Sequence, residues 1–408
     1  MGGQLGQEFS LLIYRPDPPR RTEPQIFMKK NIKILGLLNG YSSQMSGGDK
    51  QFIKLINYIA ARQAVGVLLP SRVYKKDFDQ RVTRFEYANP ASVEKSYKNN
   101  FLLLVLYVFR IIISTWRLLW SDFDVLISSS HLFFDTVPML FLPKRNRHFF
   151  TAIYHLVGEQ NRKGLHRLVT AFLEKLALWV LRHRRVYCLT SSPYVAGLLV
   201  SKYKFDPKLI LPIKIGLDIK NIKRTKPSPQ KFDLVFCGRL HHRKGIYTLL
   251  KIVQEMKKAR PDIKLAIIGD GPEKHDLRAE AARRKLSGHI KFFGYTDDNH
   301  KYSLLKSSRV FLLPSFEEGW GIVIAESLAC RTPVVVSSIP EIKRIWRQHV
   351  IWANQLNADS FVKGVEAMLS NHDKHRRLAK KGYEYIQQFD WDEVLENEYR
   401  QIKKVVST

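Results

Sequence analysis

The sequence predicts an α/β protein with two doubly wound domains that face each other across a cleft. Short runs of β-branched and apolar residues alternate with longer helical segments along the chain. Continuous apolar strands separated by helices are typical of parallel sheets covered on both faces. The series is interrupted by the polar, proline-bearing segment KRTKPSPQK at residues 223–231 and then starts again. We therefore expect two domains joined near residue 223, with ligands bound beyond the carboxyl ends of the strands.

The apolar runs define the expected strands and domain boundaries. The first domain is expected to contain strands at Ile32–Leu38, Val65–Leu69, Asp124–Ser128, Phe149–His155, Val186–Thr190 and Ile210–Ile215. The second is expected to contain strands at Leu234–Cys237, Lys264–Ile268, Ile290–Phe293, Val310–Leu313 and Val334–Ser337. The predicted organisation is an N-terminal extension at 1–27, a first domain at 28–222, a second domain at 223–388 and a C-terminal segment at 389–408.

The N-terminal extension and the cysteines indicate the compartment. Residues 1–27 are polar, interrupted by proline and without the continuous apolar core of a signal peptide. The three cysteines, Cys188, Cys237 and Cys330, are odd in number and widely separated. The sequence therefore predicts no disulfide framework and no CxxC metal site, which favours a reducing, cytoplasmic compartment.

The charge of the chain favours an anionic partner. It has 67 Lys and Arg against 37 Asp and Glu, a formal charge of +30. Nucleic acid, an acidic membrane surface and phosphorylated substrates would all fit this balance. The sequence has no RNP1-like aromatic motif, zinc-finger spacing or basic zipper, which disfavours nucleic acid.

One apolar segment, Phe101–Trp120, does not follow the pattern of the other helices. Its length suits a bilayer crossing of about 20 residues. However, Arg110 lies in its middle, which costs roughly 2.5–3.5 kcal/mol on insertion, and the strands on either side have to join one sheet. Its polar residues fall on one narrow stripe: Arg110, Ser114, Arg117 and Ser121. Two interpretations remain open: a mostly buried helix, or a helix in a membrane interface with its arginines among headgroups.

Two basic clusters of the first domain add to the second interpretation. They are KRNR at Lys144–Arg147 and RHRR at Arg182–Arg185. Each alone fits a solvated helix end. Together with the wide apolar helix they favour docking on an anionic leaflet, where each basic residue adds about 1 kcal/mol.

The second domain contains loops suited to phosphate. Arg239, Lys244 and Gly245 lie between an expected strand and helix, where free N–H groups and two cations can bind a phosphorylated ligand. In the segment SFEEGWGIVIAES, Gly319 and Gly321 permit close approach of backbone to a ligand. The same segment carries Glu318 on the loop and Glu326 in the following helix. Their spacing alone also allows a general acid/base pair.

These motifs together resemble the retaining glycosyltransferases of family 4, which have the GT-B architecture. The matching elements, in order, are a GG turn at Gly47 and Gly48, the GRL…RKG loop, GDGP, FFGYT, LPS, EGWG, the E-x7-E pair Glu318 and Glu326, ACRTPVVVS and a terminal FDW segment. The resemblance runs from Met28 to the C-terminus and is most specific between Gly238 and Ser337. It implies two Rossmann-like domains and a final helix, Trp391–Val405, that crosses back to the first domain.

The resemblance also implies roles for individual residues. Arg239 and Lys244 would bind the donor diphosphate, and Arg243 could supplement Lys244. Glu318 would contact the donor sugar and Glu326 the ribose hydroxyls, while Glu317 would have no role. Phe293–Tyr295 would lie beside the base. The remaining donor contacts would come from Gly47, Gly48, Gly319, Trp320, Gly321 and Ile322, with His155 approaching the donor sugar. The expected donor is a UDP- or GDP-sugar, and no metal is expected because the two cations neutralise the diphosphate.

The expected function is transfer of a sugar from this donor to an acceptor with retention of anomeric configuration. A lipid-linked acceptor at the inner face of the membrane is favoured by the charge and by the apolar segment at 101–120. A soluble polysaccharide or small-molecule acceptor is the alternative within the same chemistry. A catalytically inactive nucleic-acid- or membrane-binding module is the alternative from another class.

Overall fold

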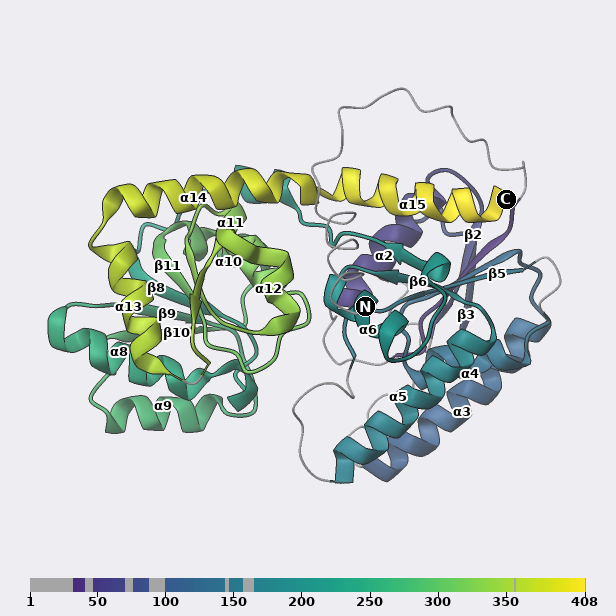
Figure 1. The fold of residues 1–408 in the computed structure, drawn as a ribbon, viewed down its shortest axis with the longest axis horizontal. Coiled ribbons are helices and arrows are strands. Elements are labelled where there is room, and N and C mark those ends of the chain that lie inside the picture. The colour runs from purple at the N-terminus through teal and green to yellow at the C-terminus, as the bar shows by residue number, and fades with distance from the viewer. Residues whose placement is uncertain are drawn as a thin grey trace. The chain divides into compact units, whose positions relative to one another are not determined.

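The computed structural model describes residues 32–40, 47–69, 76–87, 100–143, 147–156, 165–355 and 357–407. The predicted extension at 1–27 and most of the Lys144–Arg147 cluster lie outside these ranges. The described chain forms two compact units (Figure 1). The first unit runs to Ile215 and includes the chain again from Asp392, and the second is Gly216–Trp391.

The first unit is built on a seven-stranded parallel sheet with the order β3-β2-β1-β4-β5-β6-β7. Its strands are β1 Ile34–Leu37, β2 Val65–Leu69, β3 Arg84–Tyr87, β4 Val125–Ser128, β5 His148–Ala152, β6 Tyr187–Thr190 and β7 Ile210–Pro212. The core strands are buried because their runs are apolar throughout, as in Val65–Leu69. Strand β3 was not predicted, since the sequence RFEY has no continuous apolar run.

Helices cover the first sheet. They are α2 Gly47–Ala60, α3 Asn100–Leu119, α4 Phe133–Phe141, α5 Leu165–His183 and α6 Pro193–Ser201. Figure 1 shows α3, α4 and α5 along one side of this unit, and α4 packs against both of the others. The last helix, α15 Trp391–Ser407, belongs to the first unit from Asp392 onward. Its buried Glu398 accepts a hydrogen bond from Gln51 Nε2 of α2 at 2.8 Å.

The second unit has a six-stranded parallel sheet with the order β10-β9-β8-β11-β12-β13. Its strands are β8 Phe232–Cys237, β9 Leu265–Ile268, β10 Ile290–Gly294, β11 Ser308–Leu313, β12 Val334–Ser337 and β13 Ile351–Ala353. The short edge strand β13 was not predicted. The doubly wound α/β architecture expected from the sequence is confirmed in both units.

Helices lie on both sides of the second sheet (Figure 1). One group is α8 Ile246–Ala259, α9 Lys274–Arg283 and α13 Ala358–Leu369; the other is α10 Asp298–Lys306, α11 Ile322–Ala329 and α12 Pro340–Trp346. The remaining helices are α7 Ile219–Arg224 and α14 His372–Ile386. Because α7 packs on α10 and α11, the chain changes from the first unit to the second at residue 216.

The polar stripe of α3 faces inward. Arg110 and Ser114 are fully buried, whereas Ile112 and Trp116 are exposed over about 60% of their surface, at 62% and 60%. The interpretation of a mostly buried helix is therefore wrong, and Arg110 does not lie at the surface, where the interface interpretation placed it; contact of this helix with a membrane interface stays a prediction. None of the helices in the described ranges combines the length and apolarity that a bilayer crossing requires.

Candidate donor site in the second unit

The candidate site lies at the carboxyl edge of the second sheet, where β8 and β11 are neighbours. From this pair the chain winds outward to β9 and β10 on one side and to β12 and β13 on the other. Ligands of doubly wound sheets bind at such a switch point. The two loops that leave it are joined by a hydrogen bond from the backbone N–H of Phe316 to the carbonyl of Arg243, at 2.9 Å. The predicted site segments therefore meet at one edge.

Two glycines are required by the backbone here. Gly245 has φ +67°, and a Cβ at this position would lie 1.9 Å from the carbonyl oxygen of Pro314. Gly321 has φ +81° and forms the N-terminal cap of α11. A residue with a side chain would be strained at both positions. Gly245 thus allows the β8 loop to pack against the end of β11, and Gly321 allows the start of α11 to pack against Ile324 and Trp346.

Glu318 is held by two donors. Lys244 Nζ lies 2.7 Å from Glu318 Oε1, and the buried Ser315 hydroxyl donates to the same oxygen at 2.7 Å. The side chain of Glu318 is almost fully buried, whereas that of Lys244 keeps part of its surface exposed. The structure thus brings together two residues that the sequence assigned to the diphosphate and to the sugar.

The next pair of residues repeats this arrangement. Arg243 Nη1 lies 2.7 Å from Glu317 Oε1; Arg243 is more exposed than Lys244, and Glu317 is more exposed than Glu318. Glu317 therefore has a structural partner, although no role was predicted for it. Arg239 is exposed, and its guanidinium makes no hydrogen bond or ion pair with the described residues. It is a cation available to an anionic ligand at the start of the β8 loop.

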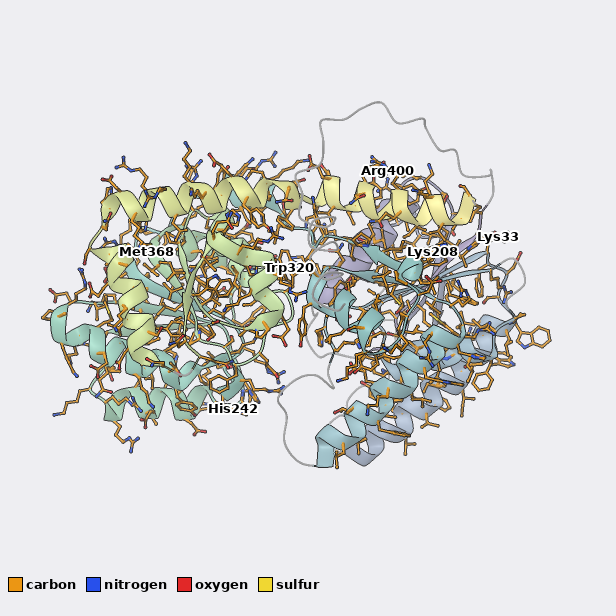
Figure 2. The ribbon with its side chains drawn as sticks, viewed as in Figure 1. Lys33, Lys208, His242, Trp320, Met368 and Arg400 are labelled. Atoms are coloured by element: carbon orange, nitrogen blue, oxygen red, sulfur yellow. The ribbon has the colours of Figure 1, made fainter. Side chains whose placement is uncertain are left out.

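The EGWG segment leads into the N-terminus of α11. Gly319 and Trp320 precede the cap, and Ile322 is the first helical residue, so backbone N–H groups of this turn lack helical partners. Trp320 is buried, and its carbonyl accepts a hydrogen bond from Trp346 Nε1 at 2.9 Å. Figure 2 shows Trp320 among packed side chains, whereas His242 reaches outward. The turn is thereby fixed and its amides are suited to a negatively charged or hydroxyl ligand.

Glu326 points back from α11 toward α10. Its Oε1 lies 2.7 Å from Lys301 Nζ and 3.4 Å from the Tyr302 hydroxyl. Burial lowers the pKa of Lys301, but the Glu326 carboxylate raises it, and the net pKa lies above its ordinary value. Burial and the same carboxylate raise the pKa of Tyr302. Glu326 Oε2 is buried and has no hydrogen-bond partner among the described residues.

The end of β10 provides an aromatic surface at the same sheet. Phe293 packs edge-on against Phe232 and His300, and Tyr295 is exposed over 77% of its surface. The hydroxyl of Thr296 is buried without a partner in the described chain. An exposed ring beside an unpaired polar group suits a planar base with polar edges.

One histidine cluster borders the site. The ligand atoms of His241, His242 and Glu273 lie within 4.8 Å of one another, close enough for a metal ion. Glu273 already accepts from the backbone N–H of His242 at 2.7 Å, and His242 Nδ1 lies 3.0 Å from the same oxygen. Through these contacts the Glu273 carboxylate links the loop after β8 to the loop after β9.

Three predicted residues belong to the first unit. Gly47 and Gly48 form the first turn of α2 and not a turn before it, as the sequence suggested. His155 is exposed and lies beyond the end of β5 at Ala152, where a longer strand was expected. Its ring is 6.4 Å from that of His131, whose Nε2 contacts the buried Glu174 at 2.9 Å.

Sequence reasoning missed Lys301, Tyr302 and Ser315. Lys301 and Tyr302 are separated from Glu326 in the sequence by the whole strand β11, and no spacing rule connects two neighbouring helices on one side of a sheet. Ser315 could have been found, because it precedes Glu318 by three residues in the same turn.

Comparison with known proteins shows what the second unit is similar to. Residues 218–385 match the family described as glycosyl transferases group 1. Over 169 residues the chain is 31% identical to a phosphatidyl-myo-inositol mannosyltransferase of Mycobacterium tuberculosis, which covers 40% of this chain and 44% of that protein. Over 151 residues it is 30% identical to a lipopolysaccharide core biosynthesis glycosyltransferase of Rhizobium meliloti, covering 36% and 43%. The chain thus spans less than half the length of these curated relatives.

Solved structures extend the likeness to the first unit. The Anabaena protein HepE, in complex with UDP and glucose, is similar with a TM-score of 0.69 at 15% identity, over 92% of this chain and 100% of that one. This likeness shows the fold. Residues 218–385 are therefore similar to group 1 glycosyl transferases, and the chain has the GT-B fold that the sequence predicted.

Proposed function

We propose that the protein is a retaining glycosyltransferase of family 4 that transfers a sugar from a UDP- or GDP-sugar to a lipid-linked acceptor at the cytoplasmic face of the membrane. The observation that carries the proposal is Glu326, whose buried Oε2 has no partner in the described chain. A buried carboxylate oxygen is costly unless a donor reaches it. The ribose hydroxyls of a nucleotide supply such donors.

The remaining groups fit the rest of the donor. Arg239 and Lys244 neutralise the diphosphate, and the amides around Ile322 contact sugar and phosphate. Lys244 is already paired with Glu318, so its charge is positioned before the donor arrives. Because these cations stand where a metal would otherwise act, we expect no metal requirement.

The chemistry follows from where charge develops. The bond between the anomeric carbon and the diphosphate oxygen breaks, which leaves positive charge on the sugar and negative charge on the phosphate. Preorganised cations and amides stabilise the departing phosphate. The acceptor hydroxyl attacks from the same face, its oxygen bonds to the anomeric carbon and its proton passes to that phosphate. The anomeric configuration is retained without a covalent enzyme intermediate.

A lipid-linked acceptor is supported by one relative's substrate. The mycobacterial relative is described as acting on phosphatidyl-myo-inositol, a lipid. The charge of +30 would favour a surface of anionic lipid.

A donor screen tests the proposal. UDP- and GDP-sugars are added singly to the full chain with excess chelator, and thermal unfolding is followed. A donor at 100 times its Kd should raise the stability by about 2.7 kcal/mol. The product formed from the best donor is then examined by NMR for the configuration of its anomeric carbon. Absence of any shift at millimolar donor, or an inverted product, would overturn the proposal.

A further inference from the structure

The outer surface of α3, α4 and α5 is apolar. Among the described residues, every exposed large hydrophobic side chain except Tyr295 lies on these helices or directly after α3. We call these residues the apolar face: Val105, Val108, Phe109, Ile112, Trp116, Leu119, Trp120, Phe141, Leu168, Val169, Phe172, Leu176 and Trp179. On α3 and on α5 they recur at helical spacing, so each helix directs one continuous side outward.

The same helices direct their polar groups inward. Arg110 Nη1 of α3 donates to the carbonyl of Asn39 at 3.1 Å, and Ser114 Oγ accepts from Asn39 Nδ2 at 3.0 Å. Glu174 of α5 contacts His131 at 2.9 Å. Asn39 and His131 follow β1 and β4, so these contacts fix the helices on the carboxyl end of the sheet. The outward direction of the apolar side chains is therefore set by buried hydrogen bonds.

The apolar face is larger than a water-exposed surface normally carries. Trp116 and Trp120 are exposed over 60% and 79%. Since an aromatic side chain presents about 150–250 Å², these two alone expose roughly 200–350 Å². The largest apolar patch of a typical monomer is about 300–600 Å² in total. Eleven further hydrophobic residues join the two tryptophans, so the surface requires an apolar partner.

Charge identifies the partner. The acidic residues of the three helices are Asp135 and Glu174, and both are buried. Lys175 and Arg182 of α5 are exposed. A second copy of the chain would bring the same positive charge, from a molecule of net +30. An anionic bilayer instead offers acyl chains for the apolar residues and phosphates for the cations.

We propose that the apolar face is a docking surface for a bilayer that contains anionic lipid. The helices lie along the membrane, with Trp116, Trp120 and Phe172 about 5–10 Å deep at the boundary of headgroups and acyl chains. Lys175 and Arg182 contact lipid phosphates. The inference rests on the proposed function and deepens it, because it names the surface that brings the enzyme to a lipid-linked acceptor.

Vesicle flotation of the full chain tests the docking. The probes are vesicles of phosphatidylcholine alone and of phosphatidylcholine mixed with phosphatidylglycerol. The wild type should float with the mixed vesicles, and added salt should weaken the binding. Trp116→Ser combined with Trp120→Ser should reduce the partition coefficient about tenfold or more, because both apolar anchors are lost. Trp116→Phe combined with Trp120→Phe should still bind.

Two further variants test the role of the cations. Lys175→Gln with Arg182→Gln should reduce binding to the mixed vesicles about fivefold per charge. Arg376→Gln with Lys380→Gln removes the same charge from exposed positions of α14 and should change binding much less. Equal loss in the two pairs would show attraction by net charge alone and would overturn the assigned surface.

Fluorescence and oligomeric state complete the test. Lipids brominated in the acyl chain should quench the wild type more than the variant with Phe at residues 116 and 120. Unchanged flotation of the double serine variant would overturn the proposal. Failure of the wild type to bind vesicles would also overturn it. If the wild type is then a dimer and the double serine variant a monomer, the partner of the apolar face is a second copy of the chain. The donor-induced thermal shift, measured without vesicles, is independent of this face: its absence alongside normal flotation would reject the proposed function and leave the docking surface standing.

Discussion

Oε1 of Glu326 lies 2.7 Å from Nζ of Lys301, while the second carboxylate oxygen of Glu326 has no partner among the described residues. The two carboxylate oxygens of Glu326 thus differ in whether they have a hydrogen-bond partner. The first belongs to a buried ion pair that stabilises the packing of α10 on α11. The second is available to a ligand, and a ligand that leaves it unpaired would bind poorly.

Substitution of Glu326 separates these two roles. Glu326→Ala removes one of the two carboxylates that Lys301 contacts and leaves the other, Asp298, at 2.8 Å, so we expect the free energy of unfolding to fall by about 1–3 kcal/mol. Glu326→Gln keeps an acceptor for Lys301 and should cost less. Both should weaken donor binding by roughly ten- to a hundredfold, since each removes a charged hydrogen-bond acceptor. Thermal unfolding and donor titration measure the two effects. Full donor affinity in a folded Glu326→Gln protein would show that the ribose does not contact this oxygen.

The two neighbouring ion pairs of the β8 loop predict unequal effects on rate. Lys244→Met removes the cation that is paired with the nearly buried Glu318, and we expect kcat/KM to fall about 10²–10³-fold. Arg243→Met is the matched control, because its pair with Glu317 is more exposed and should contribute little. Steady-state kinetics with the best donor measure kcat/KM for the two variants and for the wild type. If Arg243→Met is the more damaging variant, Arg243 is the cation at the diphosphate.

The contact between Gly245 and Pro314 predicts a backbone requirement. Gly245→Ala combines a left-handed φ of +67° with a Cβ only 1.9 Å from the carbonyl oxygen of Pro314. We expect the free energy of unfolding to fall by about 2 kcal/mol or more, together with donor affinity, because the β8 loop must shift. Gly288→Ala is the control, since no atom lies within 4 Å of the added Cβ. It should stay within about 0.5 kcal/mol of the wild type. Denaturant unfolding distinguishes them, and equal stability of the two would contradict the tight packing of this loop.

The second unit shows where sequence reasoning is strong. The strand Val334–Ser337 begins with three valines and is buried throughout because both faces of a parallel sheet are covered, so its apolar run predicts the strand. The short edge strand Ile351–Ala353 gives no such signal. Loops at strand ends can be recognised by glycine and charge, as with Arg239 and Gly245. The partners of Glu326 could not be found, because they depend on how two helices lie against one sheet.

The helix α3 has a polar stripe whose direction could not be predicted from the sequence. A polar stripe normally faces water, and one of the two interpretations placed the arginines of this stripe among lipid headgroups. In the structure these side chains satisfy the carbonyl and amide of Asn39 at the end of β1. Periodicity identifies which residues share a side of a helix. It does not say which side is buried when the core itself contains polar groups.

The buried Glu398 predicts how stability depends on pH. Burial raises the pKa of Glu398 from 4.5 to about 7, although Gln51 donates a hydrogen bond to it. Below pH 4.5 the group is protonated in both states. Between pH 4.5 and about 7 the unfolded chain loses its proton and the folded chain keeps it, so the free energy of unfolding falls as pH rises. The loss is complete above about pH 7. The difference in pKa corresponds to about 3 kcal/mol at most.

Glu398→Gln should remove this contribution. The amide stays neutral at every pH and still accepts from Gln51, so the variant should gain about 3 kcal/mol relative to the wild type between pH 4 and pH 8. A residual slope is expected, because burial also raises the pKa of Asp135 to about 7. Glu393→Gln, at an exposed position of the same helix, is the control and should keep the wild-type slope. Denaturant unfolding across this range provides the comparison. A Glu398→Gln protein with the full wild-type slope would mean that the carboxylate is ionised in the folded state and that α15 tolerates a buried charge.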